Sequence, residues 1–190
     1  MQASYYWALV TFVAIILLVL LRTLQLKKQG IDAIEFGKKD KSDFILPPFA
    51  LCYVYLLVAN AFHLPTLPKQ LLFHSTTLSH VGVFVCVLAV ALFAWTLLSF
   101  KKSFRVGLAE NTVQGLVTTG AFAISRNPIY VCFALMLLGQ FLIYSAWLFL
   151  IFLLAGMVRF HKQVLKEEIF LKEQYKSVYD DYCRKVKRYL

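Results

Sequence analysis

Acidic residues are scarce in this chain, in which 10 Asp and Glu stand against 20 Lys and Arg among 190 residues. In a soluble protein the net charge of +10 would suggest nucleic acid. However, 60% of the residues are hydrophobic and the mean hydropathy is +0.68, whereas a soluble domain is about 45–50% apolar. We therefore predict a membrane protein whose basic loops face anionic lipid, and no nucleic-acid partner.

Cysteine and metal-ligand motifs are equally sparse. The four cysteines, Cys52, Cys86, Cys132 and Cys183, are scattered, and none forms a C-x-x-C pair. No histidines and carboxylates recur at ligand spacing. The sequence therefore indicates neither a disulfide framework nor a metal site.

Glycine is also infrequent, and the Gly-rich dinucleotide fingerprint is missing. Gly115 and Gly120 are five residues apart, which is not G-x-G-x-x-G, and no predicted strand precedes them. Too little chain lies outside the apolar runs for a nucleotide-binding α/β domain of about 150 residues. We expect these two glycines to allow close backbone approach or positive φ.

Long apolar runs predict an all-α, polytopic fold with about five transmembrane helices. The runs cover residues 5–21, 44–64, 78–100 and 129–160. A single helix over the last run would be about 48 Å long, against about 30 Å of hydrocarbon. We therefore predict a helical hairpin that turns near Tyr144 and Ser145.

The basic residues predict the orientation. Residues 22–43, 101–128 and the tail from Arg159 hold six, four and nine of them, and only Lys69 lies in the intervening loops. By the positive-inside rule, the N-terminus lies outside and the C-terminus lies in the cytoplasm. Positive charge follows the first run instead of preceding it, which favours a retained first helix over a cleaved signal peptide.

The tail, residues 159–190, carries apolar and aromatic residues at spacings of three and four. This pattern predicts a C-terminal amphipathic cytoplasmic helix, whose aromatic face packs on the membrane surface or over the 101–128 loop. Asn60, in the second run, is expected to make a helix–helix hydrogen bond. We predict one membrane domain over 1–190, with three spans in 1–100 and the catalytic part in 101–190.

Arg126-Asn127-Pro128 stands directly before an apolar run, and two interpretations of its arginine remain open. Arg126 is either an anchor for lipid phosphate or a fixed fork for a carboxylate or phosphate ligand. Pro128 restricts Asn127 to extended backbone and starts the next helix, whose free N–H groups favour an anion. Tyr130 lies in the first turn of that helix.

Glu167 and Glu168 follow the last apolar run by a few residues. They are either solvated and paired with Lys166 or Lys172, or they accept ligand hydroxyl or amino groups. His161, the single histidine on the predicted cytoplasmic side, is either a base or an interfacial polar residue.

These two motifs together resemble the isoprenylcysteine carboxyl methyltransferase family and its relatives, the phospholipid N-methyltransferases. That family's pattern is roughly G-x-Y/F-x-x-x-R-H-P-x-Y, a hairpin, and E-E-x-x-L-x-x-x-F-G-x-x-Y-x-x-Y-x-x-x-V-x-R. The chain matches it from Gly115 to Arg188, with two departures. Asn127 replaces a histidine, and Lys176 replaces a glycine, so the turn there must be helical or rebuilt.

The resemblance implies an integral membrane methyltransferase that uses S-adenosylmethionine and acts on a lipophilic acceptor at the cytoplasmic face. Its favoured reaction is carboxyl O-methylation of an isoprenylcysteine-like substrate. The alternatives are phospholipid amine N-methylation, an NADPH-dependent sterol-reductase-like enzyme, and a non-enzymatic membrane scaffold or transporter. By this resemblance Arg126 and Glu168 orient cofactor or substrate, and the cofactor is bound by Leu116, Val117, Gly120, Phe122, Arg126, Asn127, Tyr130 and Glu167.

Overall fold

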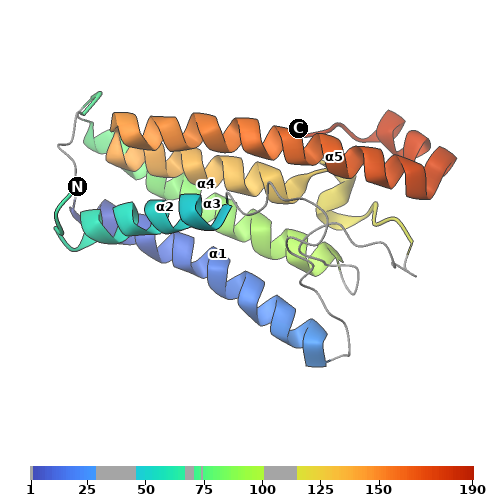
Figure 1. Cartoon of the computed structure of the whole chain (residues 1–190), viewed down its shortest axis with the longest axis horizontal. Helices are drawn as coiled ribbons and strands as arrows, with labels where there is room; N and C mark the ends of the chain where they lie inside the picture. Colours follow the sequence, from blue (N-terminus) through green and yellow to red (C-terminus); the bar gives the residue numbers. More distant parts are fainter. Residues whose placement is uncertain (1, 29–45, 67–70, 74, 101–114) are drawn as a thin grey trace.

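The chain forms an all-helical bundle (Figure 1). The computed structural model describes residues 2–28, 46–66, 71–73, 75–100 and 115–190. Its α-helices are α1 (Gln2–Lys28), α2 (Leu46–Ala61), α3 (Thr76–Phe100), α4 (Pro128–Tyr144) and α5 (Trp147–Lys185), and a short 3-10 helix, η2, spans Gly120–Ala123. The predicted all-α fold is confirmed, and the five α-helices agree with about five expected spans.

The helices have the composition of membrane spans. By length and hydropathy α1, α3 and α5 qualify as full spans. The apolar helices α2 and α4 have 16 and 17 residues, or about 24–26 Å at 1.5 Å per residue, slightly short of the hydrocarbon thickness. Large apolar side chains point outward, such as Leu51 (70% exposed) and Phe84 (68% exposed), a distribution suited to lipid and not to water.

Consecutive α-helices run in opposite directions, so the bundle has two ends (Figure 1). The start of α1 and the α4–α5 turn lie at one end. The end of α1, the end of α3 and the start of α4 lie at the other. In the described residues every charged side chain belongs to this second half, which we call the basic end. The arrangement agrees with the charge pattern, while the orientation across the membrane stays a prediction.

Helices α3 and α4 pack most closely, because two glycines face one another. A Cβ added to Gly82 would lie 2.5 Å from the carbonyl oxygen of Gly139, and one added to Gly139 would lie 2.6 Å from Cys86 Sγ. Small residues allow such backbone contact between membrane helices. Either glycine enlarged to alanine would force these two helices apart.

A buried polar contact joins three helices in the apolar core. Gln140 of α4 is fully buried, and its Oε1 accepts a hydrogen bond from the Tyr53 hydroxyl of α2. Its Nε2 donates to the Ala8 carbonyl of α1 over 3.2 Å. By contrast, Asn60 donates to the Leu56 carbonyl of its own helix, so the expected helix–helix bond at Asn60 is wrong.

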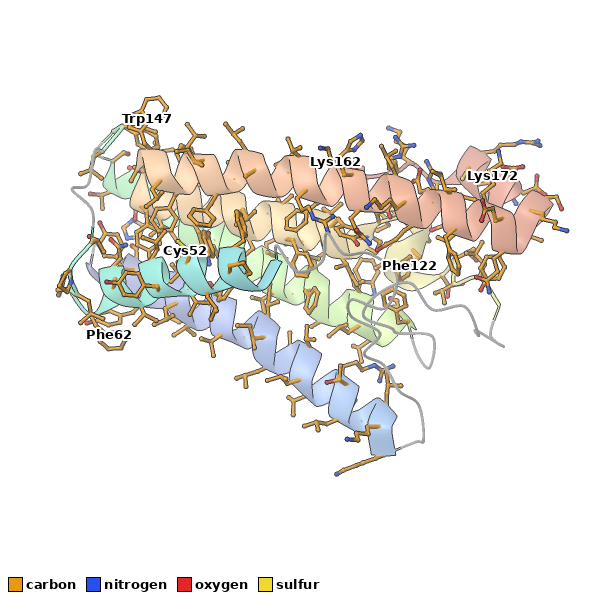
Figure 2. All side chains as sticks on the ribbon, in the orientation of Figure 1. Cys52, Phe62, Phe122, Trp147, Lys162 and Lys172 are labelled. Atoms are coloured by element: carbon orange, nitrogen blue, oxygen red, sulfur yellow. The ribbon has the colours of Figure 1, made fainter. Side chains whose placement is uncertain are left out.

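The predicted hairpin is present. Helix α4 ends at Tyr144, Ser145 adopts left-handed backbone (φ 49°), and α5 starts at Trp147. The sequence predicts an amphipathic tail helix from residue 159, but the helix of the last apolar run continues into the tail as far as Lys176, where the backbone leaves helical geometry. Helix α5 therefore leads without interruption from Trp147 at one end of the bundle past Lys172 beyond the other (Figure 2).

Helix α5 makes a sharp turn at Lys176, where φ is 48° and ψ is −123°. This is the position at which the family pattern has glycine, the residue that adopts such backbone most easily. The turn is thus rebuilt with a lysine in glycine's conformation. It sends the last turns of α5 back toward the start of α4, and a Lys172–Asp180 ion pair of 3.3 Å spans it.

Candidate active site

The segment before α4 is fixed against the end of α3. Gly120 has φ +65°, and a Cβ at this residue would lie 2.3 Å from Ser99 Oγ. That hydroxyl oxygen accepts a hydrogen bond from the Ala121 amide over 3.1 Å. Both expectations for Gly120 are confirmed, since its backbone is left-handed and closely approached. An added Cβ at Gly115 would meet no described atom within 4 Å.

Helix α4 starts at Pro128, as predicted, and Asn127 is its N-cap residue. Asn127 has φ −130° and ψ 53°, so the expected extended conformation is wrong. Its amide donates to Ser125 Oγ over 3.1 Å, which stabilises a tight bend ahead of the proline. Its side chain makes no cap bond and is turned toward α5 instead.

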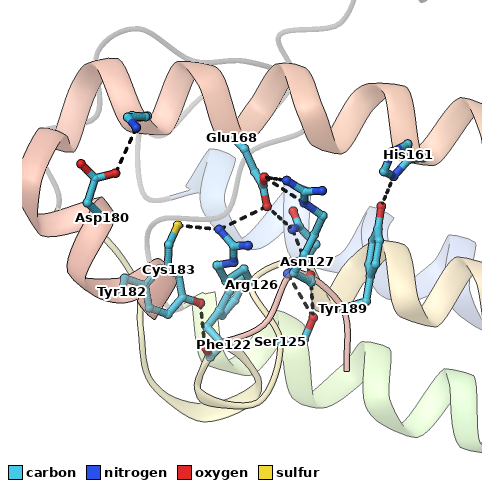
Figure 3. Close-up of polar contacts among 12 residues, drawn as sticks. Phe122, Ser125, Arg126, Asn127, His161, Glu168, Asp180, Tyr182, Cys183 and Tyr189 are labelled. Atoms are coloured by element: carbon cyan, nitrogen blue, oxygen red, sulfur yellow. Dashed lines mark hydrogen bonds and ion pairs between the residues drawn. The ribbon is translucent and has the colours of Figure 1, made fainter. Parts of the chain in front are cut away.

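Glu168 of α5 is the centre of a buried polar group that we call the Glu168 cluster (Figure 3). Its Oε1 lies 3.2 Å from Asn127 Nδ2 and 3.5 Å from Arg126 Nη1. Its Oε2 lies 3.0 Å from Nε and 2.8 Å from Nη2 of Arg188. The Glu168 side chain is 11% exposed, so this carboxylate is almost wholly enclosed by its own chain.

The segment 186–190, which we call the C-terminal strap, holds the cluster together. Its Lys187 carbonyl accepts a hydrogen bond from the Arg126 amide over 3.0 Å. Its Arg188 carbonyl accepts from Ser125 Oγ over 3.3 Å and from Asn127 Nδ2 over 3.1 Å. The side-chain hydrogen bond to Glu168 raises the pKa of Arg188 above its usual value, so the guanidinium stays charged.

Glu167 points to a second polar group, on a different face of α5. Its Oε1 accepts hydrogen bonds from the Tyr130 hydroxyl over 2.5 Å and from Gln163 Nε2 over 3.3 Å. The Tyr130 ring lies 5.9 Å from that of Phe160, centroid to centroid. The two adjacent glutamates therefore serve different partners.

The returning end of α5 and the strap cover the loop from outside. The Tyr182 hydroxyl donates to the Phe122 carbonyl over 2.6 Å, and Arg126 donates to Cys183 Sγ (Figure 3). The expected packing of the tail's aromatic face over the loop is thus found for the described part of that loop. His161 lies apart from the Glu168 cluster, with Nδ1 2.8 Å from the Tyr189 hydroxyl.

Of the residues expected at the site, the structure gathers Arg126, Asn127 and Glu168 in one cluster and Tyr130 with Glu167 beside it. Gly120 and Phe122 shape the supporting loop. Leu116 and Val117 are half-buried at the start of the described loop, and their role stays a prediction. Residues 101–114 of the predicted loop lie outside the described residues.

Sequence reasoning missed several supporting residues: Ser99, Ser125, Gln163, Cys183 and the strap around Arg188. Gln163 carries a usable signal, because it precedes Glu167 by one helical turn. Arg188 belongs to the family pattern but received no role. Nothing in the sequence points Ser99, at the end of a different helix, toward the loop.

Comparison with protein-family models matches residues 77–178 to the family described as phospholipid methyltransferase. The matched segment covers more than half of the chain and contains Arg126, Asn127, Glu167 and Glu168. The chain therefore belongs to the phospholipid methyltransferase family and is a membrane methyltransferase. A comparison with curated protein sequences finds no match.

Methyltransferases of this kind generally take the methyl group from S-adenosylmethionine, and the donor set at the basic end fits that molecule. The amino-acid end of S-adenosylmethionine needs one partner for its carboxylate and one for its ammonium group, and the ribose needs hydrogen-bond acceptors. Arg126 Nε is buried and has no hydrogen-bond partner in the described part of the chain, so this guanidinium keeps donor capacity. The described residues include no group of three or more metal-ligating side chains.

Proposed function

We propose that the chain binds S-adenosylmethionine at the basic end of the bundle and transfers its methyl group to a lipophilic acceptor. The observation that carries this proposal is the joining of Arg126 and Asn127 to Glu168, beside Tyr130 and Glu167, within the family's matched segment. Methyl transfer is a displacement at a sulfonium carbon, for which positioning supplies much of the catalysis. Residues from two helices and a strap provide that positioning.

We assign the roles by what each side chain has left to offer. Arg126 binds the cofactor's carboxylate, because its Nε has no partner among the described residues and its backbone is held by the strap. Glu167 and Tyr130 accept the ribose hydroxyls or the amino group. Glu168, whose two oxygens are already engaged, orients Arg126 and Asn127. Leu116, Val117, Gly120 and Phe122 complete the wall on the loop side.

An isoprenylcysteine-like carboxylate is the first candidate acceptor, on the strength of the sequence resemblance. A carboxylate is ionised at neutral pH and attacks without a base. The described site suits such a nucleophile, since His161 is bonded to Tyr189 away from the Glu168 cluster. The acceptor would enter from the bilayer and the cofactor from the cytoplasm.

A phospholipid amine is the second candidate, favoured by the description of the matched family. An ammonium group must lose a proton before it attacks, so this reaction needs a base. Glu167, with its Tyr130 partner, is the carboxylate we propose for that step. The proton would leave the acceptor nitrogen for a Glu167 oxygen or for water next to it.

Cofactor binding is tested by calorimetry of S-adenosylmethionine with purified full-length protein and two variants. Arg126→Ala should weaken binding about 10-fold or more, because a hydrogen bond to a charged group is lost. Arg184→Ala is the matched control, since this arginine is 79% exposed and pairs only with Asp181 among the described residues. Folded wild-type protein that binds no S-adenosylmethionine would refute the proposal.

The acceptor is tested with methyl-labelled S-adenosylmethionine and two lipids, an S-farnesylcysteine derivative and phosphatidylethanolamine. A methyl ester releases labelled methanol in mild base, whereas an N-methylated lipid keeps its label. Release of the label as methanol supports the carboxylate acceptor, and retention of the label on the lipid head group supports the amine. NADPH binding without S-adenosylmethionine binding would favour the reductase alternative.

A further inference from the structure

Arg159 occupies an unusual depth in the bundle. Residues 147–158 of α5 carry no charge, and Arg159 follows them only about 18 Å from Trp147, whereas the hydrocarbon layer is about 30 Å thick. Its neighbour Phe160 packs on Phe133 of α4, with ring centroids 5.6 Å apart. Arg159 thus lies level with the second turn of α4, nearer the apolar middle than Arg126.

A charged residue at that depth is costly, and in membrane helices such a residue marks a functional site by default. A snorkelling arginine extends freely toward lipid phosphate. Arg159 is instead half-buried, and its Nη1 donates to Gln163 Oε1 over 3.1 Å. Its guanidinium is therefore oriented by the protein.

Arg159, Gln163 and Glu167 form a ladder along one stripe of α5, with spacings of four residues. Gln163 Nε2 donates to Glu167 Oε1 over 3.3 Å, and the Tyr130 hydroxyl donates to the same oxygen over 2.5 Å. The ladder spans about 12 Å along the helix. It connects the deepest described cation with the carboxylate that we assign to the cofactor.

We propose that Arg159 binds the anionic head group of the lipid acceptor, so that this ladder sets the distance between acceptor and cofactor. The inference rests on the proposed function and adds a specificity-determining residue to it. An arginine fork matches an oxyanion with two parallel hydrogen bonds, and a partly desolvated setting strengthens that pairing. An amphipathic lipid carries such an oxyanion at the membrane boundary, the side from which Glu167 and Gln163 lead inward to Arg159.

Two lipids carry this chemistry, and they place the anion differently. In a phospholipid amine the phosphate is separate from the nucleophile, so Arg159 holds the phosphate while the amine extends toward Glu167. In a prenylcysteine the anion is the reacting carboxylate itself. This carboxylate loses its charge when its oxygen bonds to the methyl carbon and the bond between that carbon and the sulfonium sulfur of the methyl donor breaks. The methylated phospholipid would still bind through Arg159, and the methyl ester would not.

The test measures lipid retention by the purified full chain in detergent, using native mass spectrometry. The probes are dioleoylphosphatidylethanolamine and N-acetyl-S-farnesylcysteine, each with an uncharged counterpart, dioleoylglycerol and the farnesylcysteine methyl ester. The variants are Arg159→Gln and Arg159→Lys. The matched control is Lys162→Gln, which removes one positive charge from an exposed residue within one turn of the same helix.

For one of the two charged probes, Arg159→Gln should weaken binding about 10-fold or more, because the charge-assisted hydrogen bonds are lost. Arg159→Lys should recover part of this loss, since it keeps the charge without the fork. Lys162→Gln should change binding less than about twofold, as expected for a solvated charge. The uncharged counterparts should bind all four proteins alike. The probe that shows this pattern identifies the acceptor's anion as phosphate or carboxylate.

Equal losses of lipid binding in Arg159→Gln and Lys162→Gln would mean a general charge effect and would overturn the inference. So would equal weakening of charged and uncharged probes, which would mean lost packing. A fall in S-adenosylmethionine affinity with unchanged lipid binding would assign Arg159 to the cofactor instead, and would also overturn it. If wild-type protein binds no S-adenosylmethionine, the proposed function fails, yet the Arg159 and Lys162 comparison still decides the lipid contact. Thermal unfolding confirms that each variant is folded, and Arg159→Lys provides the test if Arg159→Gln is not.

Discussion

Replacing Lys176 with glycine should stabilise the protein. Lys176 is exposed, so its side chain contributes little packing, but its backbone has φ 48° and ψ −123°. A side chain in such sparsely populated backbone costs on the order of 1–3 kcal/mol. Glycine removes that strain but loses roughly 0.5–1 kcal/mol through the greater freedom of the unfolded chain. The expected net gain is about 1 kcal/mol.

The measurement is thermal unfolding of the detergent-solubilised protein, followed by circular dichroism. For a chain of this size a gain of 1 kcal/mol corresponds to a rise in Tm of roughly 2–4 °C. Lys176→Ala is the matched control, because it removes the long side chain but keeps the Cβ that causes the strain. It should leave Tm unchanged. S-adenosylmethionine affinity should not fall in Lys176→Gly, because the turn keeps its shape.

The reasoning is refuted if Lys176→Gly unfolds at the same temperature as Lys176→Ala, or below it. Either result would mean that the lysine's backbone is not strained by its Cβ. A gain shared by both variants would assign the effect to the removed charge instead. Lys176→Pro should lower Tm, since proline fixes φ near −65° and cannot make this turn.

Four further substitutions, at the site and in the core, have expected outcomes. Glu168→Gln should lower stability by about 2–4 kcal/mol in thermal unfolding, since it leaves two arginines around a nearly buried amide. By contrast, Glu167→Gln should keep Tm and weaken S-adenosylmethionine binding in calorimetry. Gly120→Ala should cost about 1–3 kcal/mol in thermal unfolding, because φ +65° and the close Ser99 hydroxyl both oppose a Cβ; an unchanged Tm would contradict this. Gln140→Leu should cost about 0.6–1.7 kcal/mol, the range for hydrogen bonds between membrane helices, with cofactor affinity unchanged in the same calorimetric assay.

Much of the fold could be predicted from apolar run lengths and charge placement. The hairpin turn at Ser145 followed from one run being too long for a single span. Pro128 at the first position of α4 followed from proline's fixed φ and missing N–H. The continuity of α5 could not be predicted, because an apolar run followed by an amphipathic pattern does not say whether the helix is interrupted between them.

The site was predictable where the family pattern names residues, and less so where contacts are tertiary. Arg126 and Glu168 were expected together, and Arg126 Nη1 lies 3.5 Å from Glu168 Oε1. The sequence does not tell which of the two adjacent glutamates is enclosed. Neighbouring side chains on a helix point about 100° apart, and only the packing of the folded chain places Glu168, and not Glu167, in the cluster. Asn60 was expected to bond to a neighbouring helix, but a polar residue in a membrane helix can bond to the backbone of its own helix instead.

The C-terminal strap has a consequence for how the protein acquires activity. Asn127 Nδ2 bonds to the carbonyl of Arg188, 61 residues later, after the chain has crossed the bundle twice in α4 and α5. Contacts between residues so distant in sequence form late in folding, because the intervening chain must be ordered first. The Arg126 amide, bonded to the strap, should therefore reach full hydrogen-exchange protection only after the amides of α4, and it would lose protection first when the native state opens locally. An inserted but immature chain would hold its helices in the membrane while the cofactor-binding wall is still incomplete.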